Sequence, residues 1–317
     1  MANSIEVKGL KKSYGKKDVL KGVDFKVESG SILALLGPNG AGKTTTVKIL
    51  CTLLKADGGG AKVAGLDVHK DEEKVRVLIG LTGQFAAVDE YLTGRENIEM
   101  IGKLYHMTAD KIAPKAQELL EKFDLVEAGD KPAKTYSGGM KRRLDLAMSL
   151  VAEPSILFLD EPTTGLDPRS RITLWEMIKQ LAESGTTILL TTQYMEEADY
   201  LAENIVVIDH GVVIAKGTPA ELKAKVGADK VIISFTAKAP FEKAKKMIKG
   251  DINENDNSIS MPAKKGVESL QETLKILQKA GLKPDAASLT RPTLDDVFLA
   301  LTGHDTGVSE EAKETKK

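Results

Sequence analysis

The segment from Gly37 to Thr44 constrains the fold of this chain more than any other part of its sequence. It reads Gly-Pro-Asn-Gly-Ala-Gly-Lys-Thr and matches the pattern G-x-x-x-x-G-K-[ST]. An apolar run at 31–36 precedes it, and a helical pattern at 44–54 follows it. Glycines let the backbone curl until successive N–H groups converge, and the start of a helix adds its positive end. The sequence therefore predicts a strand, a phosphate-binding turn and a helix that hold a nucleoside triphosphate.

Two side chains of this turn have separate roles in such a site. We expect Lys43 to neutralise the β- and γ-phosphates and the Thr44 hydroxyl to ligate Mg²⁺. The nucleotide-binding residues expected here are consecutive: Gly37, Pro38, Asn39, Gly40, Ala41, Gly42, Lys43, Thr44 and Thr45.

An apolar strand that ends in two carboxylates supplies the other side of the expected site. Residues 155–161 read Ser-Ile-Leu-Phe-Leu-Asp-Glu. Asp160 at the strand end can hold a Mg²⁺-bound water, while Glu161 points elsewhere and can accept a proton from an attacking water. An adjacent Asp-Glu pair is often only a solvated turn, so the upstream phosphate loop is what favours the catalytic interpretation.

Strand and helix patterns alternate through the first two thirds of the chain. The apolar runs are almost continuous, which is typical of strands buried on both faces of a mainly parallel sheet. The alternation predicts an α/β fold. The expected strands are 31–36, 77–82, 156–160, 187–191 and 205–209, and the expected helices include 44–54, 111–123, 141–152 and 170–183.

A second, smaller unit begins where the pattern changes near Thr218. We predict a small α+β domain with strands at 231–236, 258–261 and 286–289 and helices at 241–248, 267–280 and 294–301. The expected domains are a nucleotide-binding domain at 1–225, an accessory α+β domain at 226–302 and a disordered polar tail at 303–317.

Charge and cysteine content exclude several function classes. Lys and Arg number 45 and Asp and Glu 46, for a net charge of −1, so no general electrostatic attraction draws the chain to nucleic acid. The one cysteine, Cys51, is expected in the core, and the four histidines are too scattered to predict a metal site. No run approaches the ~20 apolar residues of a membrane span, so we expect a soluble chain in a reducing cytosol.

The segment Ser137–Leu144 identifies a family. It reads Ser-Gly-Gly-Met-Lys-Arg-Arg-Leu and lies before the strand that ends at Asp160. Taken alone, it is a helix capped by Ser137 whose Lys141, Arg142 and Arg143 form a solvated charged face. In this order and spacing with the other motifs, it resembles the signature of ABC-type ATPases. The resemblance covers roughly residues 5–222 and implies a P-loop NTPase core that uses ATP and Mg²⁺.

Further roles follow from this resemblance alone. Tyr14 would stack on adenine, and Gln84 would reach the Mg²⁺ and the attacking water. Residues 90–152 would form a helical subdomain that faces a membrane partner. Asp167 lies in a Gly-Leu-Asp-Pro segment that resembles the loop crossing the dimer interface of the family.

The resemblance also implies an assembly. Two ATPase domains would lie head to tail, and Ser137, Gly138 and Gly139 of one would cap the γ-phosphate held by the other. ATP would join the homodimer and hydrolysis would weaken it. The partner would be a separate membrane-spanning permease, with this subunit peripheral on the cytoplasmic face of the cell membrane.

Gln193 departs from the family, most of which carries histidine at this position. An amide can donate a hydrogen bond to the γ-phosphate but cannot titrate near neutral pH. Glu161 remains as the candidate base, so we expect retained but modest ATP hydrolysis. The expected catalytic residues are Lys43, Gln84, Glu161 and Gln193.

The C-terminal block narrows the resemblance to a subfamily. Residues 291–303 read Arg-Pro-Thr-Leu-Asp-Asp-Val-Phe-Leu-Ala-Leu-Thr-Gly and are similar to the C-terminal block of daunorubicin-resistance-type ATP-binding subunits. Thr293 and Asp296 form a capping box, and Leu294, Val297, Phe298 and Leu301 share one apolar face. The resemblance favours a drug or lipid exporter over a nutrient importer.

Two other functions remain open. A soluble ABC-type ATPase acting on ribosomes or DNA usually carries two ATPase domains or a long coiled coil, whereas this chain has one phosphate loop and no sustained heptads. A slowly hydrolysing nucleotide switch that regulates an assembly is suggested by Gln193.

Overall fold

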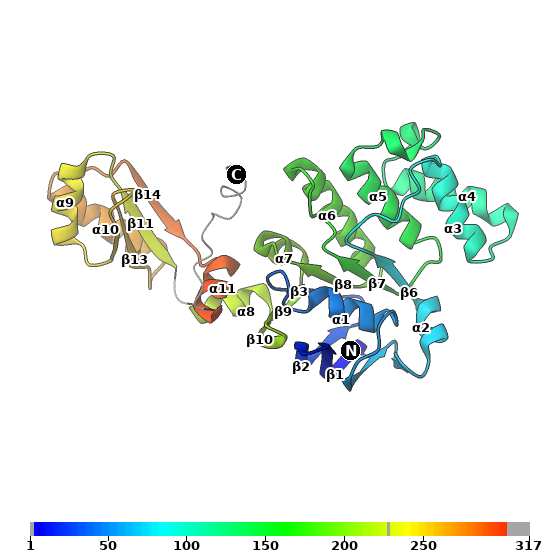
Figure 1. The fold of residues 1–317 in the computed structure, drawn as a ribbon. Coiled ribbons are helices and arrows are strands. Elements are labelled where there is room, and N and C mark those ends of the chain that lie inside the picture. Colours follow the sequence, from blue (N-terminus) through cyan, green and yellow to red (C-terminus); the bar gives the residue numbers. More distant parts are fainter. Residues whose placement is uncertain (1–2, 227–228, 303–317) are drawn as a thin grey trace, which may run out of the picture. The chain divides into compact units, whose positions relative to one another are not determined.

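The computed structural model describes residues 3–226 and 229–302 (Figure 1). The chain divides into two compact units, Met1–Pro219 and Ala220–Lys317. The division falls at the first residue of helix α8 (Pro219–Val226), whereas the expected boundary falls near the end of that helix. The expected tail at 303–317 lies outside the described residues.

A six-stranded sheet forms the centre of the first unit. Its order is β10-β9-β3-β8-β7-β6, and all neighbours are parallel except β10 and β9. Every residue of β3, β7 and β8 is buried, which explains their continuous apolar sequences and confirms the mainly parallel sheet. The strands are β3 (Ile32–Leu36), β6 (Ile79–Thr82), β7 (Ile156–Asp160), β8 (Thr187–Thr192), β9 (Asn204–Asp209) and β10 (Val212–Gly217).

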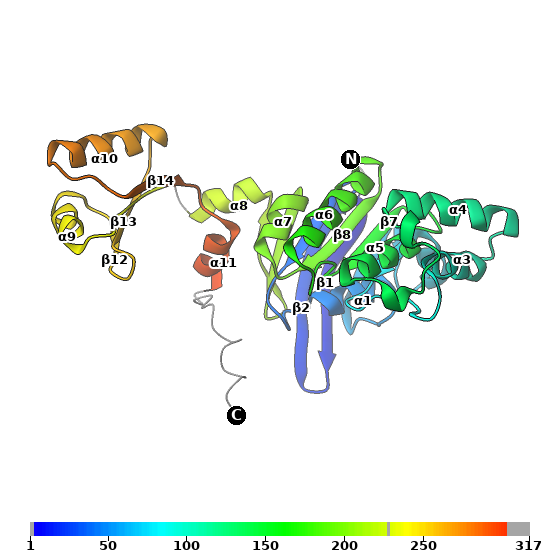
Figure 2. The same ribbon diagram turned by 90° about the horizontal axis from the view of Figure 1, so that it is seen from above.

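A second sheet is antiparallel, and none of its strands is among the expected strands given above. Its order is β2-β1-β4-β5, and β1 and β2 form a long hairpin (Figure 2). Register shifts along β1 interrupt its alternation of buried and exposed residues, so the strand pattern is weak. The strands are β1 (Asn3–Tyr14), β2 (Lys17–Glu28), β4 (Gly58–Val63) and β5 (Leu66–Asp67).

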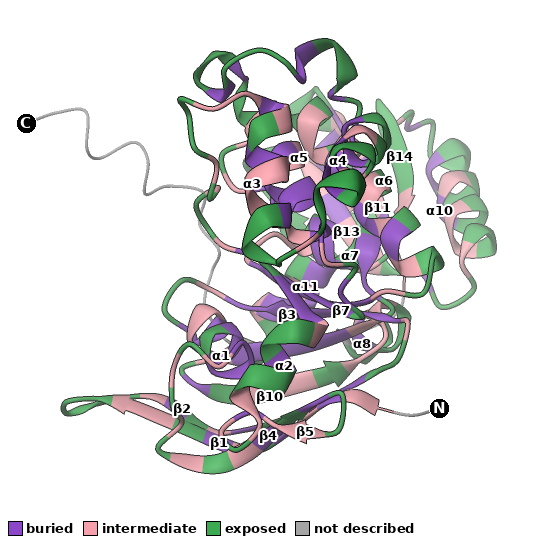
Figure 3. Cartoon of the chain, turned by 90° about the vertical axis from the view of Figure 1, so that its right-hand side faces the viewer, coloured by how far each residue is buried: buried purple, intermediate pink, exposed green. Residues whose placement is uncertain are grey.

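Helices cover both faces of the central sheet. Helix α1 (Lys43–Leu50) packs against strands of both sheets, which share one apolar core. Helices α5 (Gly138–Ser149), α6 (Pro168–Glu183) and α7 (Met195–Leu201) lie on the opposite face (Figures 1 and 3). Helices α3 (Gly94–Leu104) and α4 (Ala109–Lys122) pack on each other and on α5, within the expected helical subdomain. The remaining short elements are α2 (Glu72–Leu78), η1 (Val126–Ala128) and η2 (Ala133–Thr135).

Several element boundaries differ from the prediction by two or more residues, and three of them lie near the expected site. Helix α2 includes Val77 and Leu78, which were expected to begin a strand. Helix α1 ends at Leu50 because Thr52 adopts a left-handed φ of 60°, which a helix cannot continue through. Helix α5 begins at Gly138, three residues early, because the Ser137 side chain caps it.

The second unit has its own antiparallel sheet, in the order β12-β13-β11-β14, and its own apolar core. Strand β12 was not predicted, since all of its residues are exposed. The expected capping box is present: Asp296 N donates to Thr293 Oγ1 at 3.2 Å, and Thr293 N donates to Asp296 Oδ2 at 2.7 Å. The remaining elements are β11 (Lys230–Ser234), α9 (Lys238–Met247), β12 (Asp251–Asn253), β13 (Ser258–Pro262), α10 (Val267–Lys279), β14 (Ala286–Thr290) and α11 (Leu294–Thr302).

Cys51 is buried in the core of the first unit, as expected, and burial raises the pKa of its thiol. Across residues 3–226 and 229–302, no helix combines the length and the apolar character that crossing a membrane requires. The same residues contain no group of His, Cys, Asp and Glu side chains arranged to hold a metal ion by themselves.

Candidate nucleotide-binding site

The glycine-rich segment turns the chain from the carboxyl end of β3 into helix α1. A Cβ atom on Gly37 would lie 2.1 Å from the carbonyl oxygen of Ile208 in β9, so only glycine fits there. Gly42 has a φ of 108°, which also favours glycine, and it immediately precedes the first residue of α1. Close packing thus fixes the turn and brings the positive end of α1 to the edge of the sheet.

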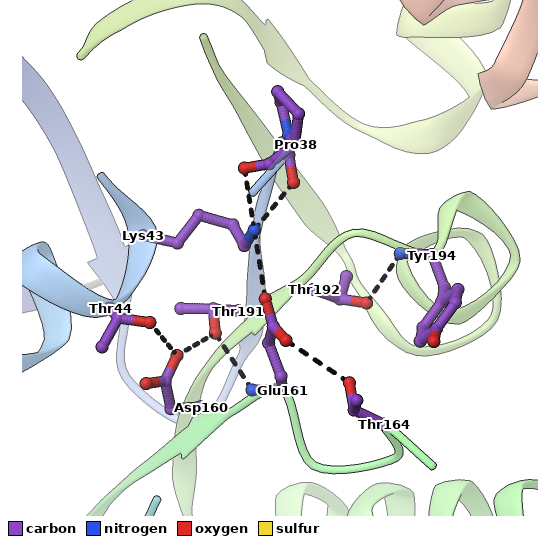
Figure 4. A network of polar contacts seen from close by, with 10 residues as sticks. Pro38, Lys43, Thr44, Asp160, Glu161, Thr164, Thr191, Thr192 and Tyr194 are labelled. Carbon is purple, nitrogen blue, oxygen red and sulfur yellow. Dashed lines mark hydrogen bonds and ion pairs between the residues drawn. The ribbon is translucent and has the colours of Figure 1, made fainter. Parts of the chain in front are cut away.

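The Lys43 side chain bends back over this turn and is 4% exposed. Its Nζ donates to the carbonyl oxygens of Gly37 at 2.8 Å and Pro38 at 3.1 Å (Figure 4). The same ammonium group lies 3.2 Å from Oε1 of Glu161. A buried ammonium group with these partners is poised for an anion, because phosphate oxygens can replace any of the three.

Thr44 and Asp160 meet at the carboxyl end of β7. Thr44 Oγ1 donates to Asp160 Oδ1 at 3.1 Å, and Thr191 Oγ1 of β8 donates to the same oxygen at 2.5 Å (Figure 4). A hydroxyl and a carboxylate are the oxygen ligands that Mg²⁺ prefers. These two residues could therefore hold Mg²⁺ beside a bound nucleotide. Thr191 was not among the predicted site residues, although a polar end on an apolar strand was a visible signal.

Glu161 has an unusual backbone conformation, with a φ of 51°. Its N–H donates to Thr191 O and Thr191 Oγ1, both at 3.1 Å, and Thr164 Oγ1 donates to its carboxylate at 3.4 Å. The residue is only 6% exposed. A non-glycine residue held at positive φ is strained, and the bonds to β8 hold it so that its carboxylate faces Lys43 and not the sheet.

Three other predicted site residues lie apart from this cluster. Gln84 is exposed, on the segment after β6, and Gln193 is half-buried, one residue after β8. Within the described residues, no hydrogen bond joins either side chain to Thr44, Asp160 or Glu161. Tyr14 ends β1 and is 50% exposed, as a ring available for stacking would be.

The segment Ser137–Gly139 starts α5, and Ser137 Oγ accepts from Met140 N at 3.2 Å. A Cβ on Gly139 would lie 2.6 Å from Ser170 Oγ of α6, so the two helix starts are in close contact. Asp167 caps α6 and accepts from Ser170 N at 3.0 Å and Ser170 Oγ at 2.6 Å. These bonds hold the pKa of the Asp167 carboxyl below its usual range. In the described part of the chain no hydrogen bond joins Ser137–Gly139 to the turn at Gly37–Gly42.

Comparison with known proteins accounts for both units. Residues 20–164 match the family model described as ABC transporter, and residues 217–302 match the C-terminal domain of DrrA1-3-like ATP-binding proteins. Daunorubicin resistance ATP-binding protein DrrA2 of Streptomyces coeruleorubidus is 50% identical over 98% of both chains. The chain belongs to the ABC transporter family.

A second relative and a solved structure agree with this assignment. Daunorubicin/doxorubicin resistance ATP-binding protein DrrA of Streptomyces peucetius is 44% identical over 99% of this chain and 97% of its own. A solved ATP-binding cassette, dimeric in a post-hydrolysis state with ADP and Pi, is 25% identical with a TM-score of 0.62 over 68% of this chain and 98% of its own. The family resemblance and the P-loop fold are thus confirmed. This ABC ATPase is the ATP-binding subunit of a transporter.

One prediction about α5 of this ABC ATPase was wrong. Arg142 is not on a solvated charged face; it is 7% exposed, and Asp145 one turn later is 4% exposed. Periodicity could not reveal this, because an arginine is buried only when tertiary contacts supply partners for its donors. Lys141 and Arg143, on either side of Arg142, are half-buried.

Glu197 on α7 places a buried carboxylate behind the site, and no sequence pattern indicated it. Its Oε1 accepts from Thr163 Oγ1 at 2.7 Å and from Trp175 Nε1 of α6 at 2.9 Å. Burial raises the pKa of this carboxyl. Glu197 thereby ties α6 and α7 of the ABC ATPase to the segment that follows Glu161.

Proposed function

We propose that this ABC ATPase drives the export of a drug-like or lipid molecule through a separate membrane-spanning permease. Support comes from the names of its nearly full-length relatives, which are daunorubicin and doxorubicin resistance proteins. The second unit also matches the C-terminal domain of the DrrA-like proteins. In this proposal the subunit works as a homodimer, peripheral on the cytoplasmic face of the membrane.

The observation that carries the proposal is the convergence of Lys43, Thr44, Asp160 and Glu161 at the ends of β3 and β7. Lys43 binds the phosphates once it releases Glu161, and Thr44 and Asp160 provide oxygen ligands for Mg²⁺. Bound Mg²⁺ supplies charge neutralisation between the phosphates. The released carboxylate of Glu161 then accepts a proton from the attacking water.

The second half of each ATP site comes from the other subunit in this proposal. The capped start of α5 presents the N–H groups of Gly138 and Gly139 and the hydroxyl of Ser137, which suit an anion. Asp167 would lie at the subunit contact beside it. Gln84, Gln193 and Tyr14 would join the site on nucleotide binding, Gln84 and Gln193 at the γ-phosphate and Tyr14 at the base.

The proposal is tested by comparing Glu161→Gln with Glu176→Gln, which changes an exposed glutamate on α6. We expect Glu161→Gln to lower ATP turnover by a factor of about 100 or more, since no other carboxylate of residues 3–226 and 229–302 forms an ion pair with Lys43. With ATP and Mg²⁺, the same variant should accumulate as a dimer in light scattering, with the permease supplied if needed. If Glu161→Gln kept full ATP turnover, Glu161 would not be the catalytic base. If the variant stayed monomeric with ATP and Mg²⁺, the two subunits would not share the ATP site.

A further inference from the structure

The segment between β6 and α3 is held by side chains of α5 that belong to no predicted site. Arg142 Nη1 donates to the carbonyl oxygen of Gly83 at 2.7 Å, and Arg142 Nη2 donates to the carbonyl oxygen of Gln84. A guanidinium group presents its donors as a rigid fork, so two successive carbonyls fix both position and direction of the backbone.

Asp145 completes the same attachment one helical turn further along α5. Its Oδ1 accepts from the N–H of Ala87 at 2.9 Å, while its Oδ2 lies 3.7 Å from Arg142 Nη1. Both residues are almost fully buried. The charges of Arg142 and Asp145 therefore stabilise each other, because burial removes both groups from water.

Few other hydrogen bonds of the described residues hold the backbone of residues 83–87. Outside helices and strand ladders, the backbone–backbone hydrogen bonds of the described residues include none from residues 83–88. The Phe85 side chain is 85% exposed, and Gln84 is exposed as well. The backbone of this segment is thus held from α5, while its side chains remain free to meet other groups.

We propose that Arg142 and Asp145 are positioning residues that attach the Gln84 segment to the signature helix. The inference rests on the proposed roles of Gln84 beside the nucleotide and of Ser137 opposite the second subunit. Ser137 caps the start of α5, and Arg142 and Asp145 of the same helix hold residues 83–87. Any movement of this helix on dimer closure therefore also moves Gln84. The attachment thereby couples arrival of the second subunit to completion of the first subunit's site.

The test uses the full chain and variants that separate positioning from folding. Replacing Arg142 alone leaves a buried unpaired carboxylate, so the informative variant is Arg142→Met combined with Asp145→Asn, which removes both charges together. Arg142→Lys keeps the charge but lacks the fork. Arg143→Met is the matched control, because Arg143 binds Phe123 O and Asp124 from the same helix instead.

In the double variant we expect amide exchange of Ala87 and its neighbours to accelerate by about tenfold or more, as for a segment that opens locally. Exchange in α1 should be unchanged. ATP turnover should fall by about 10- to 100-fold, while KM for ATP should stay within about threefold of the wild-type value. The reason is that the substitutions displace Gln84 but do not change the residues expected to bind the phosphates. Arg142→Lys should be intermediate, and Arg143→Met should leave exchange at 83–87 unchanged.

Wild-type exchange at residues 83–87 in the double variant would overturn the proposal, as would turnover equal to that of the wild type. An equal loss of turnover and ATP affinity would also overturn it, because that pattern indicates general damage. Failure of the proposed function is distinguished by Glu161→Gln. If that variant turns over ATP normally the catalytic assignment fails, whereas an inactive Glu161→Gln beside a fully active double variant rejects the attachment alone.

Discussion

At the scale of single residues, the Lys43 ammonium group has protein partners that a bound phosphate would compete with. Two backbone carbonyls and the Glu161 carboxylate contact this ammonium group. In the proposed function a bound phosphate replaces the carboxylate, and that exchange would free Glu161 at the moment when a base is needed. In that proposal, the same contact would lower the affinity for ATP and prepare Glu161 for catalysis.

Glu161→Gln should consequently tighten ATP binding, apart from its effect on turnover. The substitution removes a negative charge 3.2 Å from Lys43, which competes with the phosphates for the ammonium group and repels them. Relief of about 1 kcal/mol corresponds to an affinity gain of about fivefold. Titration with a fluorescent ATP analogue and Mg²⁺ measures it, with Glu176→Gln as control. An affinity equal to or weaker than that of the wild type would contradict the exchange.

Gly37 is a second residue whose role can be tested alone. A Cβ there would overlap the carbonyl oxygen of Ile208, so Gly37→Ala must push β3 and β9 apart. We expect a loss of about 1–3 kcal/mol in the free energy of unfolding, together with loss of ATP binding. Gly60→Ala in β4 is the control, because its added Cβ would meet nothing within 4 Å. Equal urea midpoints for the two variants would show that the close approach is not limiting.

At the scale of elements, buried carboxylates on helices α5 and α7 hold the loops of the site. Asp145 of α5 reaches the segment after β6, and Glu197 of α7 reaches the segment after β7. Each helix therefore acts as a support whose inner face carries charge as well as apolar side chains. A purely apolar helix could pack as well but could not fix a loop backbone or a threonine hydroxyl.

Asp145 should make the stability of the chain depend on pH. Burial raises the pKa of its carboxyl from 3.8 to about 6, so between these values the folded state retains a proton that the unfolded state has released. Rising pH thus favours unfolding in this window, by up to ~3 kcal/mol, and adds nothing further above pH 6. Urea unfolding at pH 4, 5 and 7 measures this effect as a difference: from pH 4 to pH 7 the wild type should lose stability relative to Asp145→Asn by about this amount. Parallel curves for the two proteins would contradict it.

Glu197 offers a test through Trp175, which is the one tryptophan of the chain. Glu197→Ala leaves the buried Trp175 N–H and Thr163 hydroxyl without their acceptor, at a cost of about 2–4 kcal/mol. Glu197→Gln retains an acceptor oxygen and should lose less than half of that. Tryptophan emission during urea unfolding reports both values. Equal destabilisation by the two substitutions would mean that charge, and not hydrogen bonding, is what matters.

At the scale of the whole molecule, two separate cores predict two unfolding events. The site lies in the first unit, whose core is shared by its two sheets, while the second unit has a core of its own. ATP and Mg²⁺ at about 100 times the dissociation constant should stabilise the first unit by about 2.7 kcal/mol, which raises its transition by roughly 5–10 °C. Scanning calorimetry should show the second transition unmoved. A single transition that moves as a whole would indicate that the units unfold together.

The sequence by itself determined the family, the phosphate turn and the parallel strands of the central sheet, but not the antiparallel edge strand β10 of that sheet. Their signals are local: continuous apolar strands, glycines at fixed spacing and a lysine followed by threonine. The capping residues Ser137 and Thr293 were also predictable, because a cap bonds within its own first turn. Spacing along the chain was sufficient wherever the interacting groups were neighbours in the chain.

Only the tertiary structure decided which charged groups are buried and what they hold. The sequence pattern predicted Arg142 on the surface. In the structure it donates to the carbonyl oxygens of residues 83 and 84, which lie 59 and 58 positions away in the sequence. Thr191 and Glu197 were missed for the same reason, since their partners come from distant strands and helices. The hairpin of β1 and β2 is local, and it was missed because register shifts interrupt its alternation of buried and exposed residues. Whether a polar side chain is solvated or buried depends on long-range partners, and no local pattern encodes those.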